Sequence, residues 1–101
     1  MSSISLSTAL SGISAANERL RASAHNTANL GTENFRREQV EMSTTANNGG
    51  VQTTTTRAAQ TGVDPATEMV EQRSATYAFV ANLRVLQTQV RAEGTLLDIH
   101  A

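Results

Sequence analysis

The helical spacing of apolar residues in the first and last thirds of the chain constrains its fold more than any other feature. In the first third, apolar residues follow one another at intervals of four, three, seven and four, with Asn17 at the skipped position: Leu6, Leu10, Ile13, Leu20 and Ala24. This is the a/d seam of a helix that packs along another helix. Gly12 costs such a helix about 1 kcal/mol relative to alanine. We predict a marginal helix, from about Ser3 to Leu30, that needs a partner.

The last third begins with the clearest helix start in the sequence. Asp64 suits the N-cap, Pro65 the first helical position and Glu68 the first turn. Apolar residues then recur at helical spacing up to about Asp98: Met69, Val70, Tyr77, Val80, Leu83, Leu86, Val90 and Leu97. A helix of about 33 residues would be about 50 Å long, and such a length favours coiled-coil packing.

The residues near the end of the first helix carry a stop signal. Gly31 and Asn34 are the residue types that most readily enter left-handed backbone space. Asn26 and Asn29 are three residues apart, so their amides share one face and can bind carbonyl groups of this helix or of a neighbour. The simpler alternative is a plain helix C-cap with two solvated amides.

The middle of the chain is polar and rich in turn-forming residues. Asn47-Asn48-Gly49-Gly50 is a strong turn signal, and the threonine-rich run from Val51 to Thr56 suits a strand. An isolated two-stranded ribbon is marginally stable at best. We therefore expect a short hairpin or loop that orders only against neighbours, with disorder in the free chain as the alternative.

These segments predict a mainly α fold in one structural unit. Residues 1–34 form an N-terminal axial helix and its cap, residues 35–62 an extended or β-ribbon middle, and residues 63–101 a C-terminal axial helix. The two terminal helices pack as an antiparallel coiled-coil-like pair, joined by a short β-hairpin or extended loop. Their apolar stripes are wide, so we expect assembly with further copies to complete the fold. From pattern alone, the leucine seam could instead be the core of a private helical hairpin.

Composition excludes several classes of function. The formal net charge is −1 and cysteine is absent, which argues against a nucleic-acid partner and against thiolate chemistry. The apolar runs are too short for a cleaved signal or a membrane span. His25 and His100 have no carboxylates at ligand spacing, and no glycine-rich phosphate loop is present. We expect no enzyme activity, no metal, no cofactor and no membrane insertion.

The stop signal of the first helix is part of a longer motif. The segment from Asn26 to Arg36 resembles the signature Asn-x-Ala-Asn-x-x-Thr-x-Gly-Phe plus a basic residue, with Asn34 in place of glycine and Glu33 where proline is common. That signature follows an Ala/Ser-rich helix in the bacterial flagellar basal-body rod proteins, kin of the hook and hook-associated axial proteins. Because asparagine tolerates the left-handed conformation, the turn should survive.

A second motif near the other end resembles the same family. Ala75 to Leu83 is similar to its Ala-x-Arg-x-Tyr-x-Ala-Asn core, with Tyr77 at the usual arginine and Phe79 as the aromatic residue. The resemblance is to the small proximal-rod type and covers about the first 37 and the last 38 residues, while the middle is shorter than expected of even the small rod subunits. Asn82 is then a candidate for a buried amide that fixes helix register, although a solvated amide fits the pattern equally.

The resemblance implies a structural subunit of the periplasmic flagellar rod, needed for flagellum assembly and motility. Such subunits are exported unfolded by the flagellar type III apparatus without a cleaved signal peptide, and they stack helically with copies of themselves and with other axial proteins. The alternative is a soluble helical-hairpin adaptor or chaperone-like module that dimerises through the same stripes. The candidate assembly interface consists of Leu6, Leu10, Ile13, Leu20, Asn26, Asn29, Phe35, Met69, Phe79, Asn82, Leu83, Leu86, Val90 and Leu97.

Overall fold

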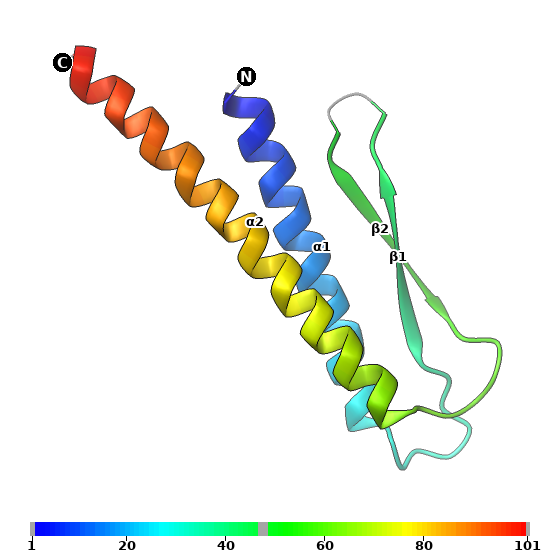
Figure 1. Ribbon diagram of the computed structural model, residues 1–101. Helices are drawn as coiled ribbons and strands as arrows, with labels where there is room; N and C mark the ends of the chain where they lie inside the picture. Colours follow the sequence, from blue (N-terminus) through cyan, green and yellow to red (C-terminus); the bar gives the residue numbers. More distant parts are fainter. Residues whose placement is uncertain (1, 47–48, 101) are drawn as a thin grey trace.

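The chain folds into two long antiparallel helices joined by a β-hairpin, which confirms the predicted mainly α fold. The computed structural model describes the backbone of residues 2–46 and 49–100, and the side chains of residues 6–46 and 49–96. The elements in chain order are α1 (Ser2–Ala28), β1 (Glu38–Thr44), β2 (Val51–Arg57) and α2 (Pro65–His100) (Figure 1).

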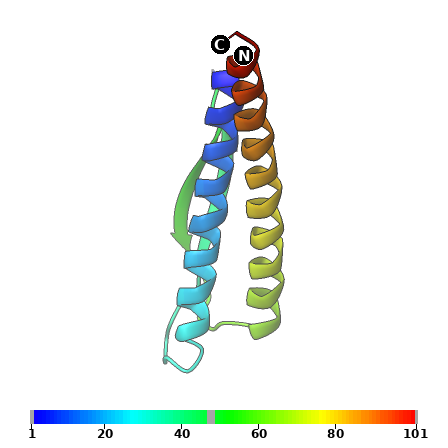
Figure 2. The ribbon, with the colours of Figure 1, turned by 90° about the vertical axis from the view of Figure 1, so that its left-hand side faces the viewer.

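The elements form three layers with α1 in the middle. Figure 1 shows α2 on one side of α1 and the hairpin on the other, and Figure 2 shows the two helices side by side with the hairpin behind α1. The molecule measures 62 × 25 × 15 Å, so it has little interior. The described ends of α1 and α2, Ser2 and His100, lie at the same end of the molecule.

The start of α2 follows the predicted cap. The carboxylate of Asp64 accepts a hydrogen bond from the backbone N–H of Ala66 (3.1 Å) and another from the hydroxyl of Thr67 (3.0 Å). Pro65 occupies the first helical position, where its missing N–H has no helical partner to lose. The helix therefore begins where the sequence predicted, and it continues to His100.

The end of α1 confirms one part of the predicted stop and corrects another. Asn34 has a φ of 62°, as expected for the left-handed turn, but Gly31 does not have a positive φ. The reason is that helix-like turns continue past Ala28: the N–H of Thr32 still bonds the carbonyl of Asn29 (3.0 Å). The chain direction changes only afterwards, at Asn34.

Small residues, and not the leucine seam, form the contact surfaces between the elements. The buried apolar residues among the described side chains are Ala9, Ala15, Ala16, Ala22 and Ala75. By contrast, Leu10 is 53% exposed, and Leu6, Ile13 and Leu20 are only half-buried. The leucine seam is therefore partly covered within the chain, with Leu10 left exposed. Alanine lets the backbones approach closely, and it makes the fully buried apolar contacts that the leucines do not make.

Gly12 and Asn82 pack tightly against each other between the two helices. A Cβ atom built on Gly12 would lie 2.5 Å from Oδ1 and 2.6 Å from Cγ of Asn82, closer than real Cβ atoms come. The Asn82 amide also donates to the carbonyl of Ala78 (2.8 Å), which limits where it can move. Gly12 lowers the helix propensity of α1, but its missing side chain leaves the space in which Asn82 packs.

The hairpin is antiparallel and lies along α1. Its register pairs Glu38 with Arg57 at one end and Thr44 with Val51 at the other. The N–H of Val51 donates to the hydroxyl of Ser11 (3.0 Å), which joins the strand to α1. The ribbon predicted to order against a neighbour therefore orders against its own first helix. Of the predicted turn, Asn47 and Asn48 lie outside the described residues, while Gly49 has a φ of 72°.

We expect Gly12→Ala to destabilise the chain although alanine is the better helix former, because the new methyl group would overlap the Asn82 side chain. In an Asn82→Ala background, the same substitution should raise the free energy of unfolding by about 1 kcal/mol. Urea unfolding of the four variants measures this coupling. Equal effects of Gly12→Ala in both backgrounds would contradict the proposed packing.

Candidate assembly interface

Two faces of α1 are occupied within the chain. Arg19 and Ser23 bond residues of α2, and Ser11 and Glu18 bond residues of the hairpin. The third face carries the residues of the predicted heptad seam, all of them half-buried or exposed: Leu6, Leu10, Ile13, Asn17, Leu20 and Ala24. We call this set the open seam. It has the spacing of a helix-packing surface, and the described chain covers it only in part: Leu10, Asn17 and Ala24 stay exposed.

One flank of α2 continues the apolar surface of the open seam. Counting about 100° per residue from Glu68 and Ala75, which face α1, places Met69, Val80 and Leu83 on one flank of α2. Because the helices are antiparallel, this flank and the open seam lie on the same side of the pair. Met69 is 65% exposed, Val80 is 38% exposed and Leu83 is half-buried. Exposed apolar side chains on one side of a helix pair are typical of a surface that binds another chain, although Gln72 and Thr76 also lie on this flank.

The rest of α2 is also more apolar than a solvent-facing helix. Val70 and Tyr77 are each 69% exposed, and Val85, Val90 and Leu96 are also exposed. A helix that is apolar on several faces is normally covered on several faces. In this chain α1 covers only one face of α2, as the three-layer arrangement in Figure 1 shows.

The predicted interface residues fall into three groups. Leu10, Met69 and Val90 are exposed. A larger group is half-buried, and it consists of Leu6, Ile13, Leu20, Asn29, Phe35, Phe79, Asn82, Leu83 and Leu86. Asn26 is fully buried, with 0% exposure, so its assignment to an interface with other chains is wrong. Leu97 lies outside the residues whose side chains are described.

Asn26 instead joins three elements inside the subunit. Its Oδ1 accepts the N–H of Glu38 (2.7 Å), and its Nδ2 donates to the carbonyl of Glu38 (2.9 Å) and to Oε1 of Glu68 (3.2 Å). The other carboxylate oxygen of Glu68 accepts Nε of Arg37 (2.7 Å). We call Asn26, Arg37 and Glu68 the polar lock, because the cluster ties α1, the start of β1 and α2 together.

The polar lock holds a carboxylate that is almost completely buried. Burial by itself would disfavour the charged form of Glu68, but the hydrogen bonds from Arg37 and Asn26 outweigh it, so the pKa of Glu68 lies below its ordinary value. The sequence placed Glu68 correctly in the first turn of α2. It gave no signal that the partner would be Arg37, 31 residues earlier, because charge pairing over such a distance depends on the fold.

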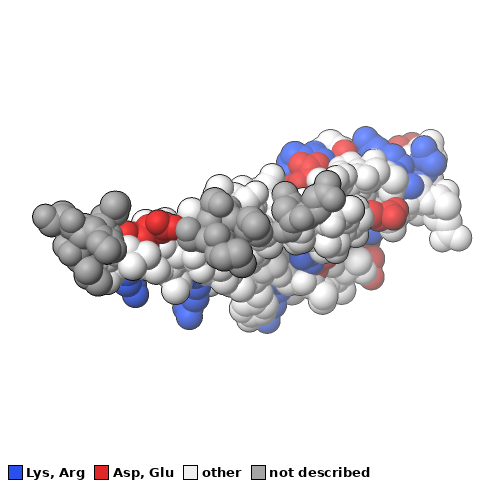
Figure 3. Space-filling model, turned by 90° about the horizontal axis from the view of Figure 1, so that it is seen from above, with Lys and Arg blue, Asp and Glu red and all other residues white. Residues whose placement is uncertain are grey.

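A second group of ion pairs strengthens the same end of the molecule. Arg19 on α1 forms two parallel hydrogen bonds with Glu71 on α2, both 3.0 Å long. Arg21 bonds Glu18 (2.8 Å) and Glu38 (3.0 Å) and so connects α1 to β1. Figure 3 shows basic and acidic side chains interspersed over this part of the molecule. Two-point arginine pairs of this kind fix orientation as well as distance.

Phe35 and Asn29 shape the loop between α1 and β1. The Phe35 ring meets the His25 ring edge to face at 5.4 Å between centroids, and the Arg57 guanidinium lies 5.3 Å from the Phe35 centroid. Asn29 donates to the carbonyl of His25 (2.9 Å) and accepts from the hydroxyl of Thr32 (2.9 Å). Both predicted interface residues therefore already have contacts within the loop and the helix end.

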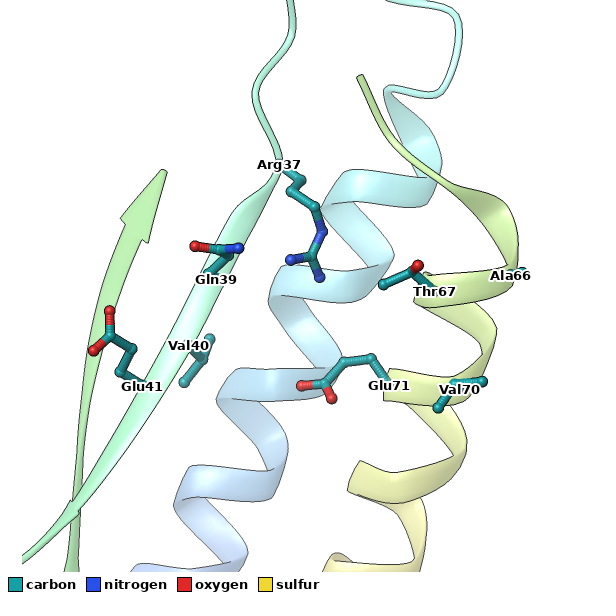
Figure 4. Close-up of a pocket in the computed structure, with 8 residues that line it drawn as sticks. All are labelled: Arg37, Gln39, Val40, Glu41, Ala66, Thr67, Val70 and Glu71. Carbon is teal, nitrogen blue, oxygen red and sulfur yellow. The ribbon is translucent and has the colours of Figure 1, made fainter. Parts of the chain in front are cut away.

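An open groove of about 750 Å³ lies between β1 and the first turns of α2. Figure 4 shows Arg37 and Glu71 extending into this groove above α1. Both side chains are engaged, Arg37 with Glu68 and Glu71 with Arg19, so neither is a free acid or base. Among the described residues, no three histidine, cysteine, aspartate or glutamate side chains lie together as a metal site.

Comparison with models of protein families gives no match for this chain, and comparison with curated proteins gives none either. Over their described lengths, neither α1 nor α2 is long and apolar enough to cross a membrane. The geometry of the open seam and the polar lock therefore carries the functional conclusion.

We expect Asn26→Ala to lower the free energy of unfolding by about 2–3 kcal/mol, because the N–H and C=O of Glu38 and one oxygen of Glu68 lose their buried partner. Hydrogen exchange should show the loss of protection first in β1. The control Asn29→Ala removes hydrogen bonds that are exposed and should cost about 0.5 kcal/mol. Similar costs for the two variants would contradict the role of the polar lock.

The lowered pKa of Glu68 predicts a loss of stability in acid. As the pH falls below about 4.5, the unfolded chain takes up this proton before the folded chain does, so the free energy of unfolding decreases. Urea unfolding of Glu68→Gln between about pH 3 and pH 6 should show a free energy of unfolding that changes much less with pH. The pH dependence that remains would come from Glu18, whose pKa is lowered by the hydrogen bond from Arg21. Glu33→Gln, at an exposed position, serves as the control. An unchanged slope in Glu68→Gln would refute the assignment.

Proposed function

We propose that this protein is a structural subunit of the bacterial flagellar basal-body rod, and that it associates with further copies and with other axial proteins through its open seam. The observation that carries the proposal is the partly exposed third face of α1. A heptad seam has the spacing of a surface that packs along a helix, and α2 packs on a different face of α1. On this proposal, a helix of another chain covers the part of the seam that stays exposed at Leu10, Asn17 and Ala24.

The roles of the motif residues support the resemblance to rod proteins. Asn26 belongs to the polar lock, Asn34 makes the left-handed turn, and Phe35 packs against His25. Asn26, Asn34 and Phe35 of the Asn-x-Ala-Asn and Gly-Phe signature thus each have a structural task at the junction of helix and hairpin. These residues hold the junction between α1 and the hairpin together. Such a role fits a polymer subunit, because the orientation of its two terminal helices must be the same in every copy.

The composition of the contact surfaces supports export in an unfolded state. The elements meet through alanines and a few polar contacts, and large apolar side chains remain outside. Such a subunit buries little apolar surface alone, so unfolding it for export through the flagellar type III apparatus costs little. Assembly in the periplasmic rod then adds the missing burial. No catalytic step and no cofactor belong to this proposal.

A soluble dimerising adaptor is the second candidate, and one observation favours it. Every buried side-chain nitrogen and oxygen among the described residues has a hydrogen-bond partner, so the single chain is internally satisfied. A chain whose buried polar groups are all hydrogen-bonded can stay folded in solution and form a dimer through the open seam. The two candidates differ in stoichiometry: a closed pair contains two copies, whereas a repeating contact that does not close gives a growing polymer.

We expect Leu10→Glu to prevent association, because it places a charge at an exposed position of the open seam without entering the interior. The control Gln60→Glu adds the same charge to an exposed loop position. Sedimentation velocity over a concentration series measures association, and swimming of a strain that carries each variant measures assembly. Growth of the wild type beyond two copies supports the rod subunit, and arrest at two copies supports the adaptor. Normal assembly and motility of Leu10→Glu would refute the role of the open seam.

A further inference from the structure

The arginines of the chain fall into two groups with different surroundings. Those on α1, beside β1 and on β2 are engaged in ion pairs with acidic side chains, namely Arg19, Arg21, Arg37 and Arg57. The three on α2 are exposed, and no ion pair or side-chain hydrogen bond joins them to any described side chain: Arg73, Arg84 and Arg91. We call these three the arginine row. Arg36, in the loop before β1, is also without an ion pair within the described part of the chain.

The arginine row occupies one line along the outside of α2. Its members are separated by 11 and 7 residues, which are close to three and two helical turns, so they lie on one side of the helix over about 27 Å. Glu68 and Ala75 mark the opposite side, which packs on α1. Figure 3 shows basic side chains along the edge of the molecule on the α2 side.

The opposite layer of the molecule presents a surface of hydrogen-bond acceptors. The strand register gives the hairpin an outer face that points away from α1 and consists of Gln39, Glu41, Ser43, Gln52, Thr54 and Thr56. All six are exposed, and Figure 4 shows Glu41 directed away from the helices. Glu41 has no ion pair with any described side chain. This outer face contains one free carboxylate, several amide and hydroxyl oxygens, and no basic residue.

We infer that the arginine row of one copy binds the outer face of the hairpin of a second copy. Strands of seven residues are about 23 Å long, close to the length of the arginine row. Guanidinium groups offer only donors, and the outer face offers a carboxylate and neutral oxygens to accept them. The second copy is the favoured partner because the two surfaces match in length and in chemistry and lie on opposite sides of α1.

This contact rests on the proposed self-association and deepens it. The arginine row and the outer hairpin face are different surfaces, so joining them is a head-to-tail contact that leaves one free surface of each kind at the ends. The open seam faces a third direction. A subunit with both contacts can bind neighbours in two independent directions, which a closed tube wall requires.

A charge-swap experiment tests the inference with full-length chains. The first variant reverses the row, Arg73→Glu/Arg84→Glu/Arg91→Glu, and the second reverses the hairpin charge, Glu41→Arg. At low salt, each variant alone should associate about tenfold more weakly than the wild type in sedimentation velocity. An equimolar mixture should recover wild-type association, because every row then finds a hairpin of opposite charge. Arg36→Glu reverses an arginine outside the row and should change nothing, and circular dichroism checks the helix content of each variant.

The outcomes separate this inference from the proposed function. The inference is overturned if both charge variants associate as strongly as the wild type. It is also overturned if the equimolar mixture associates no more strongly than either variant alone. Loss of binding to heparin by the row variant, with unchanged self-association, also overturns it, because the row would then serve an anionic polymer. If Leu10→Glu abolishes association while both charge variants associate normally, the proposed function stands and only this contact fails. A wild type that stays monomeric removes the proposed function on which the contact rests.

Discussion

The close approach of α1 to two neighbours at once determines the rest of this structure. Small residues permit backbones to come so near, and the buried apolar residues of α1 are all alanines, with Gly12 against Asn82. The larger side chains of α1 must then occupy its remaining face. The same packing that gives the single chain its shape therefore leaves apolar side chains such as Leu10 and Met69 exposed, and the proposed association would cover them.

A thin core of alanines needs directional contacts to define one arrangement, and the polar lock supplies them. Small side chains interlock weakly, so many helix positions would have similar energies without a specific contact. The amide of Asn26 binds both backbone groups of Glu38, and the buried Glu68 carboxylate accepts from two different elements. These contacts are satisfied in one geometry only. The polar lock thus contributes both to the stability of the fold and to the choice of one helix arrangement.

The sequence predicted the elements well and the contacts between them poorly. Helix spans, the Asp64 cap, the left-handed Asn34 and the hairpin depend on local backbone preferences, which a few neighbouring residues determine. The packing depends on which face of α1 meets which neighbour. Heptad spacing identified the leucine seam as a packing surface, but spacing contains no information on whether the partner belongs to the same chain. For the same reason Asn26 was assigned to an interface with other chains, although a strand 12 residues later buries it.

The distribution of strong contacts along the helix pair has a mechanical consequence. The polar lock and the Arg19–Glu71 pair clamp the helices near the hairpin loops, whereas at the opposite end α2 leans away from α1 (Figure 1). The two helices are therefore held together mainly at the end next to the hairpin loops. The angle between the two helices is consequently fixed mainly from one end, so a change in that angle would move the far ends of α1 and α2 apart while the polar lock stays intact.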